Sequence, residues 1–219
     1  MAPSHKPSSL SGEQRNSGSR VGRLFIVSAP SGAGKSTLCS AVRRNIGDLA
    51  YSVSYTTRPP RAGECEAVDY HFISEAEFKR GIDEERWAEW ARVHGNYYGT
   101  SARWIRETLN SGRDILMDID LQGARQMVRR FPDAVTIFIM PPSLAELERR
   151  LMQRAADSLQ DIDLRLQNAR EEIDQRGFCR HELLNSDIGK ATRDLMDLIE
   201  GYRRAAPGRF VQNDRGAAK

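Results

Sequence analysis

A short loop between an apolar run and an amphipathic segment constrains this chain more than any other feature. The apolar run is Leu24-Phe25-Ile26-Val27, and the segment after the loop places Leu38, Val42 and Ile46 on one helical face. The loop between them is Ala29-Pro30-Ser31-Gly32-Ala33-Gly34-Lys35-Ser36-Thr37. Strand, glycine-rich loop and helix in this order predict a phosphate-binding loop, in which backbone N–H groups and a helix N-terminus face one anion.

The residues at the end of this loop suit a nucleotide with several phosphates. The Lys35 ammonium can reach the outer phosphates, and the Ser36 hydroxyl can bind Mg²⁺. Ala29 stands where the common pattern has its first glycine. The alternative interpretation is an ordinary turn between a strand and a helix. The loop indicates a nucleotide but does not identify the reaction.

Length and composition predict a globular protein with one core. The chain has 219 residues, of which 39% are hydrophobic and 29% charged, and 33 basic against 30 acidic residues leave a net charge of +3. That charge is too small to predict a nucleic-acid partner. No apolar run approaches the roughly 18 residues of a membrane span, so no membrane partner is expected.

The cysteines and the two ends of the chain carry no further chemistry. Cys39, Cys65 and Cys179 form neither a metal spacing nor a disulfide framework, which predicts a reducing, cytoplasmic setting. Residues 1–22 are rich in Ser, Gly, Pro and Arg and predict a disordered tail, and 205–219 predict a frayed one. The first tail lacks the apolar core of a secretory signal, and an organelle transit peptide is the alternative.

Between these ends, apolar runs alternate with helical patterns. Strands are predicted at 24–27, 51–55, 115–117, 134–140 and 178–184. Helices are predicted at 35–46, around 124–128, from 144 onward, at 162–175 and after Asp187. A capping box from Ser143 to Glu146 opens the helix at 144, and Asp187 can cap the last one. This alternation predicts an α/β fold with a parallel sheet covered by helices on both faces.

Two segments interrupt the alternation. Residues 56–100 contain a turn-rich stretch, a short strand at 70–73 and a helix capped at Ser74, and they predict an inserted subdomain. Residues 149–165 contain four arginines and predict a hinge between helices. Ligands of open α/β sheets bind beyond the carboxyl ends of the strands, where both segments leave the sheet. Both are therefore expected to close over the nucleotide loop.

The first of these segments contains a candidate phosphate site. Arg58 and Arg61 are three residues apart in a turn stiffened by two prolines. Two guanidinium groups with the Tyr70 and Tyr98 hydroxyls nearby would suit a phosphate monoester. For an isolated pair of arginines, a solvated basic turn is the alternative.

Four segments resemble the signatures of guanylate kinases, in the order in which that family has them. They are residues 28–36, including Ala29, and residues 52–64, 95–100 and 118–123. The resemblance covers about 24–199. It implies a P-loop kinase core with an inserted GMP-binding subdomain and a small helical lid. The implied activity is the transfer of the γ-phosphate of ATP to GMP, and to dGMP as a further acceptor, in purine metabolism.

The resemblance also implies domain bounds and residue roles. The kinase domain would span 23–204, with the core in 23–55, 101–148 and 166–204, the GMP-binding insertion in 56–100 and the lid in 149–165. ATP would be bound by residues 29–37 and Asn185, with Mg²⁺ at Ser36 and Asp118. GMP would be bound by Ser54, Arg58, Arg61, Glu64, Tyr70, Glu89, Tyr98, Thr100 and Asp120. The implied catalytic residues are Lys35, Arg58, Arg154 and Arg165.

The chemistry of guanine agrees with a carboxylate at position 89. Guanine presents N1–H and an exocyclic NH₂ as adjacent donors, and an ionised carboxylate accepts from both. Adenine would leave Glu89 facing an unpaired lone pair, and a site of this kind can discriminate by roughly 10⁴–10⁵. Without the resemblance, the alternative for Glu89 is a carboxylate on a surface helix.

Transfer between two phosphates requires no general base, because the acceptor oxygen is already ionised. Positioning and charge neutralisation then accomplish the catalysis. We expect Arg154 and Arg165 to neutralise the transferring group when the lid closes and excludes water.

The sequence departs from the family pattern in two places. Ala155-Ala156 and Leu159-Gln160 stand where the lid commonly has a small Gly-Thr-like pair and acidic residues. The stretch 178–184 carries Arg180 and Glu182 in place of a continuous β-branched run, which suits a strand buried on both faces poorly. An edge strand and a different register are the two alternatives.

Two other functions remain as alternatives. A catalytically inactive binding module of the same fold would lack the P-loop lysine and the lid arginines, which this chain keeps. A P-loop kinase for another small acceptor is disfavoured by Ser54, Glu89 and Asp120. The sequence does not decide between a monomer and a homo-oligomer.

Overall fold

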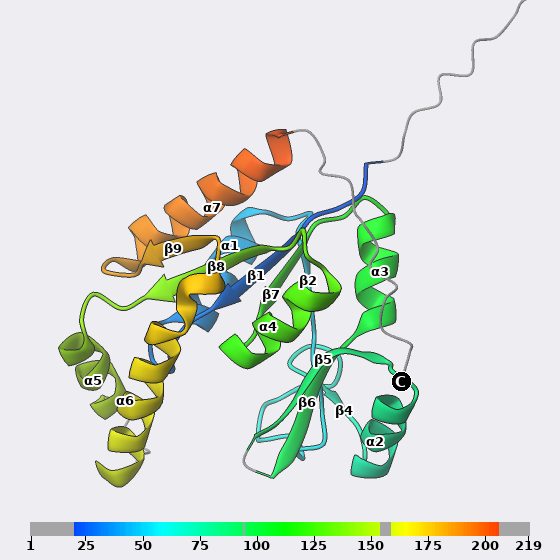
Figure 1. Ribbon diagram of the computed structural model, residues 1–219, viewed down its shortest axis with the longest axis horizontal. Helices are drawn as coiled ribbons and strands as arrows, with labels where there is room; N and C mark the ends of the chain where they lie inside the picture. The colour runs from blue at the N-terminus through cyan, green and yellow to red at the C-terminus, as the bar shows by residue number, and fades with distance from the viewer. Residues whose placement is uncertain (1–19, 94, 154–158, 206–219) are drawn as a thin grey trace, which may run out of the picture.

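The computed structural model describes residues 20–93, 95–153 and 159–205, and its centre is a five-stranded sheet (Figure 1). In spatial order the strands are β2 (Ala50–Tyr51), β7 (Ile115–Asp118), β1 (Leu24–Ser28), β8 (Val135–Met140) and β9 (His181–Leu184). All neighbours are parallel, with Leu24 opposite Ile115, Phe25 opposite Val135 and Ile137 opposite His181. The predicted α/β class with a parallel sheet is confirmed.

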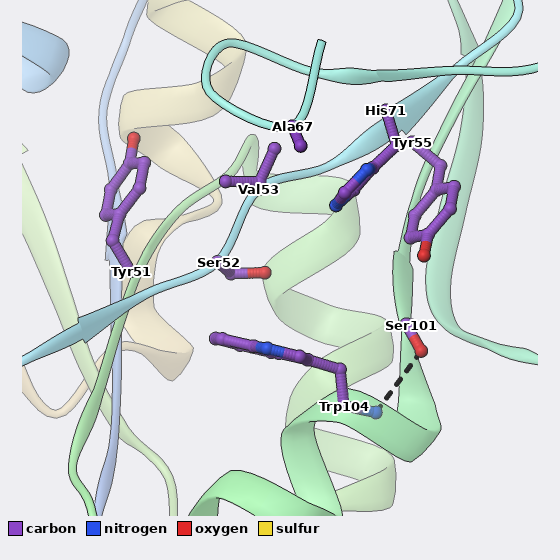
Figure 2. Close-up of a pocket in the computed structure, with 8 residues that line it drawn as sticks. All are labelled: Tyr51, Ser52, Val53, Tyr55, Ala67, His71, Ser101 and Trp104. Carbon is purple, nitrogen blue, oxygen red and sulfur yellow. Dashed lines mark hydrogen bonds between the residues drawn. The ribbon is translucent and has the colours of Figure 1, made fainter.

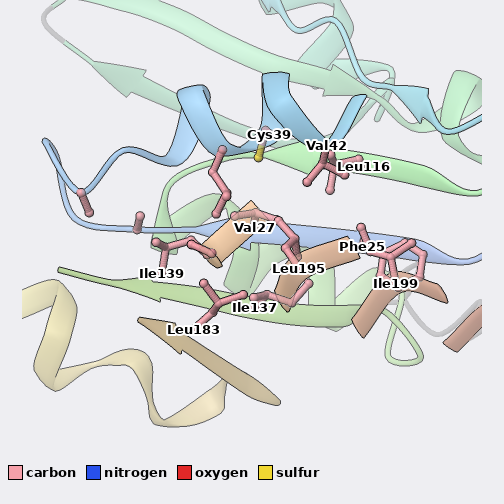
Figure 3. Close-up of a cluster of buried hydrophobic side chains, with 14 of the residues drawn as sticks. Phe25, Val27, Cys39, Val42, Leu116, Ile137, Ile139, Leu183, Leu195 and Ile199 are labelled. Atoms are coloured by element: carbon pink, nitrogen blue, oxygen red, sulfur yellow. The ribbon is translucent and has the colours of Figure 1, made fainter. Parts of the chain in front are cut away.

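Alternate residues of the central strand face opposite layers of helices. Phe25 and Val27 belong to a core with α1 (Lys35–Asn45) and α7 (Ile188–Arg204), drawn in Figure 3. Leu24 and Ile26 belong to a second core with α3 (Ala102–Asn110) and α4 (Leu121–Arg130). A strand that is buried on both faces must be apolar at every position, which explains the continuous run at 24–27.

Two further helices follow β8 and cover the loop end of the first core. They are α5 (Leu144–Met152) and α6 (Leu159–Asp174), and a short 3₁₀ turn, η1 (Arg176–Phe178), leads from α6 to β9. Ser143 caps α5 by accepting the Glu146 N–H at 3.1 Å, and Asp187 caps α7 by accepting the Lys190 N–H at 2.7 Å. Both predicted caps are confirmed. No helix within the described ranges is long and apolar enough to cross a membrane.

A separate four-stranded sheet lies between β2 and α3 in the chain. Its spatial order is β4 (His71–Phe72), β3 (Tyr55–Thr56), β6 (Asn96–Ser101) and β5 (Trp87–Val93), with α2 (Glu75–Asp83) packed against it. The Phe78 ring of α2 stacks on Trp87 and Tyr97, with centroid distances of 4.4 and 5.2 Å. Figure 1 shows this sheet and the α5–α6 pair extending from the same end of the large sheet.

Two strand predictions need correction. The single strand expected at 51–55 is two short strands, because the chain leaves the large sheet after Tyr51 and joins the small sheet at Tyr55. The strand expected from 178 begins only at His181, because 176–178 form the 3₁₀ turn. The strand β9 lies at the edge of the sheet, which is the first of the two alternatives for its charged residues, and Glu182 pairs there with Arg176 at 3.0 Å.

A buried carboxylate joins the two ends of the domain to the start of β7. The Asp114 side chain is fully buried and accepts from Arg20 Nη2 at 2.6 Å and from Arg203 Nε at 2.8 Å. It also accepts the backbone N–H of Arg23 at 2.7 Å. Three partners compensate for the desolvation of this charge.

We expect Asp114→Ala to lower the free energy of unfolding by about 3–5 kcal/mol, because two arginines lose a buried counter-charge. Urea unfolding followed by circular dichroism measures the change. Asp133→Ala, at an exposed turn position, is the control and should change stability by no more than about 0.5 kcal/mol. Equal effects from the two variants would contradict the structural role of Asp114.

Candidate active site

The glycine-rich loop connects β1 to α1 and has two left-handed glycines. Gly32 and Gly34 have φ values of 89° and 90°. A Cβ on Gly34 would lie 2.5 Å from Asn185 Nδ2, so this position excludes any side chain. The half-buried Lys35 opens α1, and Ser36 and Thr37 beside it are exposed. The loop therefore has the strand–turn–helix geometry that a phosphate-binding loop requires.

Ala29, the departure from the common loop pattern, lies in the first hydrophobic core. It is 7% exposed and clusters there with Ala33 and with Leu147 and Leu151 of α5. The left-handed conformations of the loop occur at Gly32 and Gly34, so position 29 does not require glycine.

A hydroxyl and a carboxylate meet where β7 ends beside the loop. Ser36 Oγ donates to Asp118 Oδ2 at 3.3 Å, and the Tyr51 hydroxyl donates to Asp118 Oδ1. Burial and the neighbouring Asp118 raise the pKa of Tyr51, so its proton stays on the phenol. Mg²⁺ in kinases is held by one or two such oxygen ligands together with substrate phosphates and water. Ser36 and Asp118 fit that requirement, although no cluster of three metal-ligating side chains occurs among the described residues.

The basic turn of the small sheet contains an ordered arginine. Arg58 Nη2 donates to both Glu64 oxygens, at 2.8 and 3.0 Å, and Glu64 also accepts the Arg61 N–H at 2.7 Å. The Arg58 guanidinium lies 5.4 Å from the Tyr70 ring centroid, and the Tyr70 ring packs edge-on against Tyr98 at 5.9 Å. The Arg58 hydrogen bond and the Arg61 N–H lower the pKa of Glu64, so the carboxylate stays charged. Arg58, Glu64, Tyr70 and Tyr98 thus form one group.

Arg61 differs from Arg58 in exposure. Its backbone closes the turn on Glu64, but its side chain is exposed. The Arg58 guanidinium is therefore held in place by Glu64, whereas the Arg61 side chain extends into solvent.

A buried carboxylate and a buried hydroxyl face each other across the small sheet. Glu89 on β5 is 6% exposed, Thr100 on β6 is 1% exposed, and Thr100 Oγ1 donates to Glu89 Oε1 at 2.6 Å. The two residues pair in register, and an irregularity between Trp87 and Glu89 disturbs the alternation of β5 there. The element is a strand, so the interpretation of Glu89 as a carboxylate on a surface helix is wrong.

The environment of Glu89 disfavours its ionised form. Burial raises its pKa to about 7, the Thr100 hydrogen bond opposes that effect, and nearby Asp120 raises the pKa further. Lys35 of the glycine-rich loop lowers it. The carboxylate of the small sheet and the lysine of the large one are thus within electrostatic reach of each other.

Asp120 lies close to Glu89 at the start of α4. Asp120 Oδ1 accepts the Gly123 N–H at 2.7 Å and caps the helix. A Cβ on Gly123, in the first turn, would lie 3.0 Å from Glu89 Oε2 and 3.3 Å from Asp120 Oδ1. Ser54 is half-buried, and its carbonyl accepts the His71 N–H at 2.9 Å. The structure therefore brings Glu89, Thr100 and Asp120 together beside the loop.

Asn185, expected near an adenine, lies against the glycine-rich loop. It is 3% exposed, and its Nδ2 donates to the Ala33 carbonyl at 2.7 Å. Its backbone N–H donates to Met140 at the end of β8. In this arrangement the amide group holds the loop backbone.

The remaining expected residues lie on the segment after β8. Arg165 is half-buried on α6. Arg154 and Ala155-Ala156 lie outside the described residues, as do the tails at 1–19 and 206–219.

One residue at this site was missed in the sequence. The Tyr51 hydroxyl donates to Asp118. It belongs to no local motif, since it meets its partner only through the packing of distant segments.

A cavity of about 190 Å³ lies where residues 51–55 pass from the large sheet to the small one (Figure 2). Ser52, His71 and Trp104 line it, and Ser52 Oγ is buried there with no hydrogen-bond partner among the described residues. Of the site residues above, only Tyr51 borders it. The glycine-rich loop, Glu89 and Thr100 do not line it.

Comparison with known proteins gives one consistent family. A family model described as guanylate kinase matches residues 21–202. The guanylate kinase of Nitrosospira multiformis is 46% identical over 192 residues, covering 88% of this chain and 91% of that protein. That of Geobacter sulfurreducens is 48% identical over 180 residues, covering 82% and 89%. The crystal structure of guanylate kinase from Anaplasma phagocytophilum matches with a TM-score of 0.70 at 29% identity, covering 85% and 89%.

The raised pKa of Glu89 predicts a pH-dependent cost in stability. The pKa of this carboxyl is about 7 in the folded protein and 4.5 in the unfolded chain. The group therefore stabilises the fold at low pH, where it is protonated, and this contribution is lost as the pH rises to about 7. In the Glu89→Gln variant the side chain at this position cannot ionise. Its free energy of unfolding relative to wild type should therefore be higher at pH 8 than at pH 5, by about 2–3 kcal/mol.

Urea unfolding at the two pH values measures this difference. Glu171→Gln, at an exposed position of α6, is the matched control and should show no such change. A Glu89→Gln difference that is the same at both pH values would contradict the raised pKa.

Proposed function

This chain belongs to the guanylate kinase family, and we propose that its site transfers the γ-phosphate of ATP to GMP, giving ADP and GDP. One observation carries the proposal: the buried Glu89–Thr100 pair of the small sheet lies within electrostatic reach of Lys35 in the glycine-rich loop. A guanine site and a phosphate site are thus adjacent, as direct transfer between two nucleotides requires.

The donor side consists of the loop and the end of β7. The backbone of residues 29–37 would hold the phosphates of ATP, and Lys35 would neutralise the outer ones. Ser36 and Asp118 would hold Mg²⁺, which supplies charge neutralisation across the phosphates when bound. For Asn185, the contact with Ala33 supports a role in holding the loop backbone for ATP.

The acceptor side holds the phosphate of GMP by arginines and tyrosines. Arg58 is fixed by Glu64 and lies over Tyr70, so little conformational entropy is lost when a phosphate binds it. Arg61 would add a second guanidinium, and the Tyr70 and Tyr98 hydroxyls would donate to the remaining oxygens.

We assign the recognition of guanine to the buried pair Glu89 and Thr100. Ionised Glu89 would accept both guanine donors, with Thr100 holding one of its oxygens. Ser54 and Asp120 would complete the contacts around the base. Two adjacent donors stabilise the charged form of Glu89, so binding of GMP would lower its pKa and favour ionisation at neutral pH.

The transfer step then depends on charge and alignment. The GMP phosphate oxygen attacks the γ-phosphorus of ATP, the bond to the bridging oxygen breaks, and ADP leaves; no proton needs to be removed from the nucleophile. Lys35 and Arg58 hold the two reacting ends. Arg154 and Arg165 are proposed to neutralise the transferring phosphoryl group from the lid.

We also propose the domain bounds, the further acceptor and the cellular setting that the family resemblance implies. The kinase domain would span 23–204, with the insertion at 56–100 and the lid at 149–165. Use of dGMP, a role in purine metabolism and a cytoplasmic location all rest on the family resemblance and the cysteine pattern.

The function is tested by measuring ADP production from MgATP with GMP, AMP, CMP and UMP in turn. We expect turnover with GMP and at least about 10³-fold lower kcat/KM with AMP, because adenine cannot donate two hydrogen bonds to Glu89. Activity with AMP but not with GMP would contradict the proposal. Nucleotide binding without turnover of any acceptor would favour an inactive binding module.

The proposed role of Arg165 is tested in the same assay. We expect Arg165→Ala to lower kcat with GMP by about 10²–10³, because the transferring charge loses a guanidinium. Arg170→Ala, at an exposed position of the same helix, is the control and should leave kcat within a factor of two. Turnover of Arg165→Ala within a factor of two of wild type would rule the role out.

A further inference from the structure

The helix α4 covers the outer edge of the small sheet beside the buried carboxylate. Among the described residues β5 is the last strand of that sheet, so the backbone groups on its outer side need partners other than a strand. Gln126 of α4 supplies them: its Nε2 donates to the Trp90 carbonyl at 2.9 Å, and its Oε1 accepts the Trp90 N–H at 3.1 Å. A side-chain amide has a donor and an acceptor side by side, so it can satisfy both groups at once.

Two other residues of α4 contact the same strand. Arg130 Nη1 donates to the Trp87 carbonyl. A Cβ on Gly123 would lie 3.0 Å from Glu89 Oε2, so the helix backbone packs directly against this carboxylate. Residues 123, 126 and 130 are spaced three and four apart, which puts them on one face of the helix. This face therefore contacts β5 at Glu89 and on either side of it.

The same helix is anchored in the large sheet. Ala124 and Met127 are fully buried in the second core, together with Ile26 of β1 and Met117 of β7. Asp120 caps the N-terminus of this helix. The helix thus joins Asp120 and the large sheet to the strand that carries the buried carboxylate.

We propose that Gln126 is a positioning residue for guanine recognition, which holds β5 against α4 so that the Glu89 carboxylate stays beside Asp120. The inference rests on the proposed function, which assigns guanine to Glu89. Gln126 acts through the backbone of Trp90, the residue next to Glu89. A carboxylate accepts from both donors of guanine only when its two oxygens are correctly placed, and a strand that can shift at its edge would lose this placement.

Steady-state kinetics of full-length Gln126→Ala test this role. We expect the KM for GMP to rise about five- to twentyfold, because two hydrogen bonds that place β5 are lost. The kcat and the KM for ATP should stay at their wild-type values. Gln126→Met has a side chain of similar length that cannot pair with the Trp90 backbone, so it should raise the KM for GMP by a similar factor. Arg129→Ala, at an exposed position of the same helix, is the control and should equal wild type.

A second nucleotide separates positioning from a general loss of structure. Inosine monophosphate has the N1–H of guanine but lacks its exocyclic NH₂, so it offers Glu89 a single donor. In calorimetric titrations, Gln126→Ala should weaken the binding of GMP at least about threefold more than the binding of inosine monophosphate. A fold that is merely less stable would weaken both alike, and urea unfolding of each variant verifies that the fold is kept.

Hydrogen exchange measures the contact itself. The Trp90 amide should exchange at least about tenfold faster in Gln126→Ala than in wild type, because its acceptor is removed. The Ala124 amide, which donates to the Asp120 carbonyl at 3.0 Å, is the internal control and should exchange as in wild type.

Any of three results would overturn the inference. The first is a wild-type KM for GMP in Gln126→Ala or Gln126→Met. The second is an equal loss of affinity for GMP and inosine monophosphate, and the third is unchanged exchange at Trp90. Failure of the proposed function looks different, since wild type would then not turn over GMP while the Trp90 amide would still respond to Gln126→Ala.

Discussion

The parallel pairing of β1 with both β7 and β8 is the constraint on which the rest of the structure depends. Because β1 is central and buried on both faces, its carboxyl end is fixed by two neighbours, and the glycine-rich loop begins at that fixed point. The same pairing puts Asp118 at the end of β7 beside Ser36. Asn185, which directly follows β9, then holds the loop at Ala33.

The small sheet contains a carboxylate whose charged form the fold disfavours. Glu89 is desolvated between β6 and α4, and the hydrogen bond from Thr100 only partly compensates. Such a residue costs stability when no ligand is bound, and this is a common feature of sites that must discriminate between polar ligands. The two donors of guanine would supply the missing partners.

The sequence predicted the large sheet well because each of its buried strands is a continuous apolar run, and the helices between them carry caps at Ser143 and Asp187. It failed at Tyr51–Tyr55, where one alternating run is divided between two sheets. Alternation shows that a residue is in an extended chain but not which strand it pairs with. The late start of β9 follows from the 3₁₀ turn at 176–178, which no turn signal in the sequence had marked.

The sequence by itself determined the α/β class and the position of the glycine-rich loop between a strand and a helix, because each of these is encoded in a local pattern. Only the tertiary structure decided that Glu89 is a buried strand residue facing Thr100, that Asn185 holds the Ala33 carbonyl, and that Tyr51 contacts Asp118. These contacts join segments that are distant in the chain. Burial and shared charge arise only when such segments pack together, so no local pattern records them.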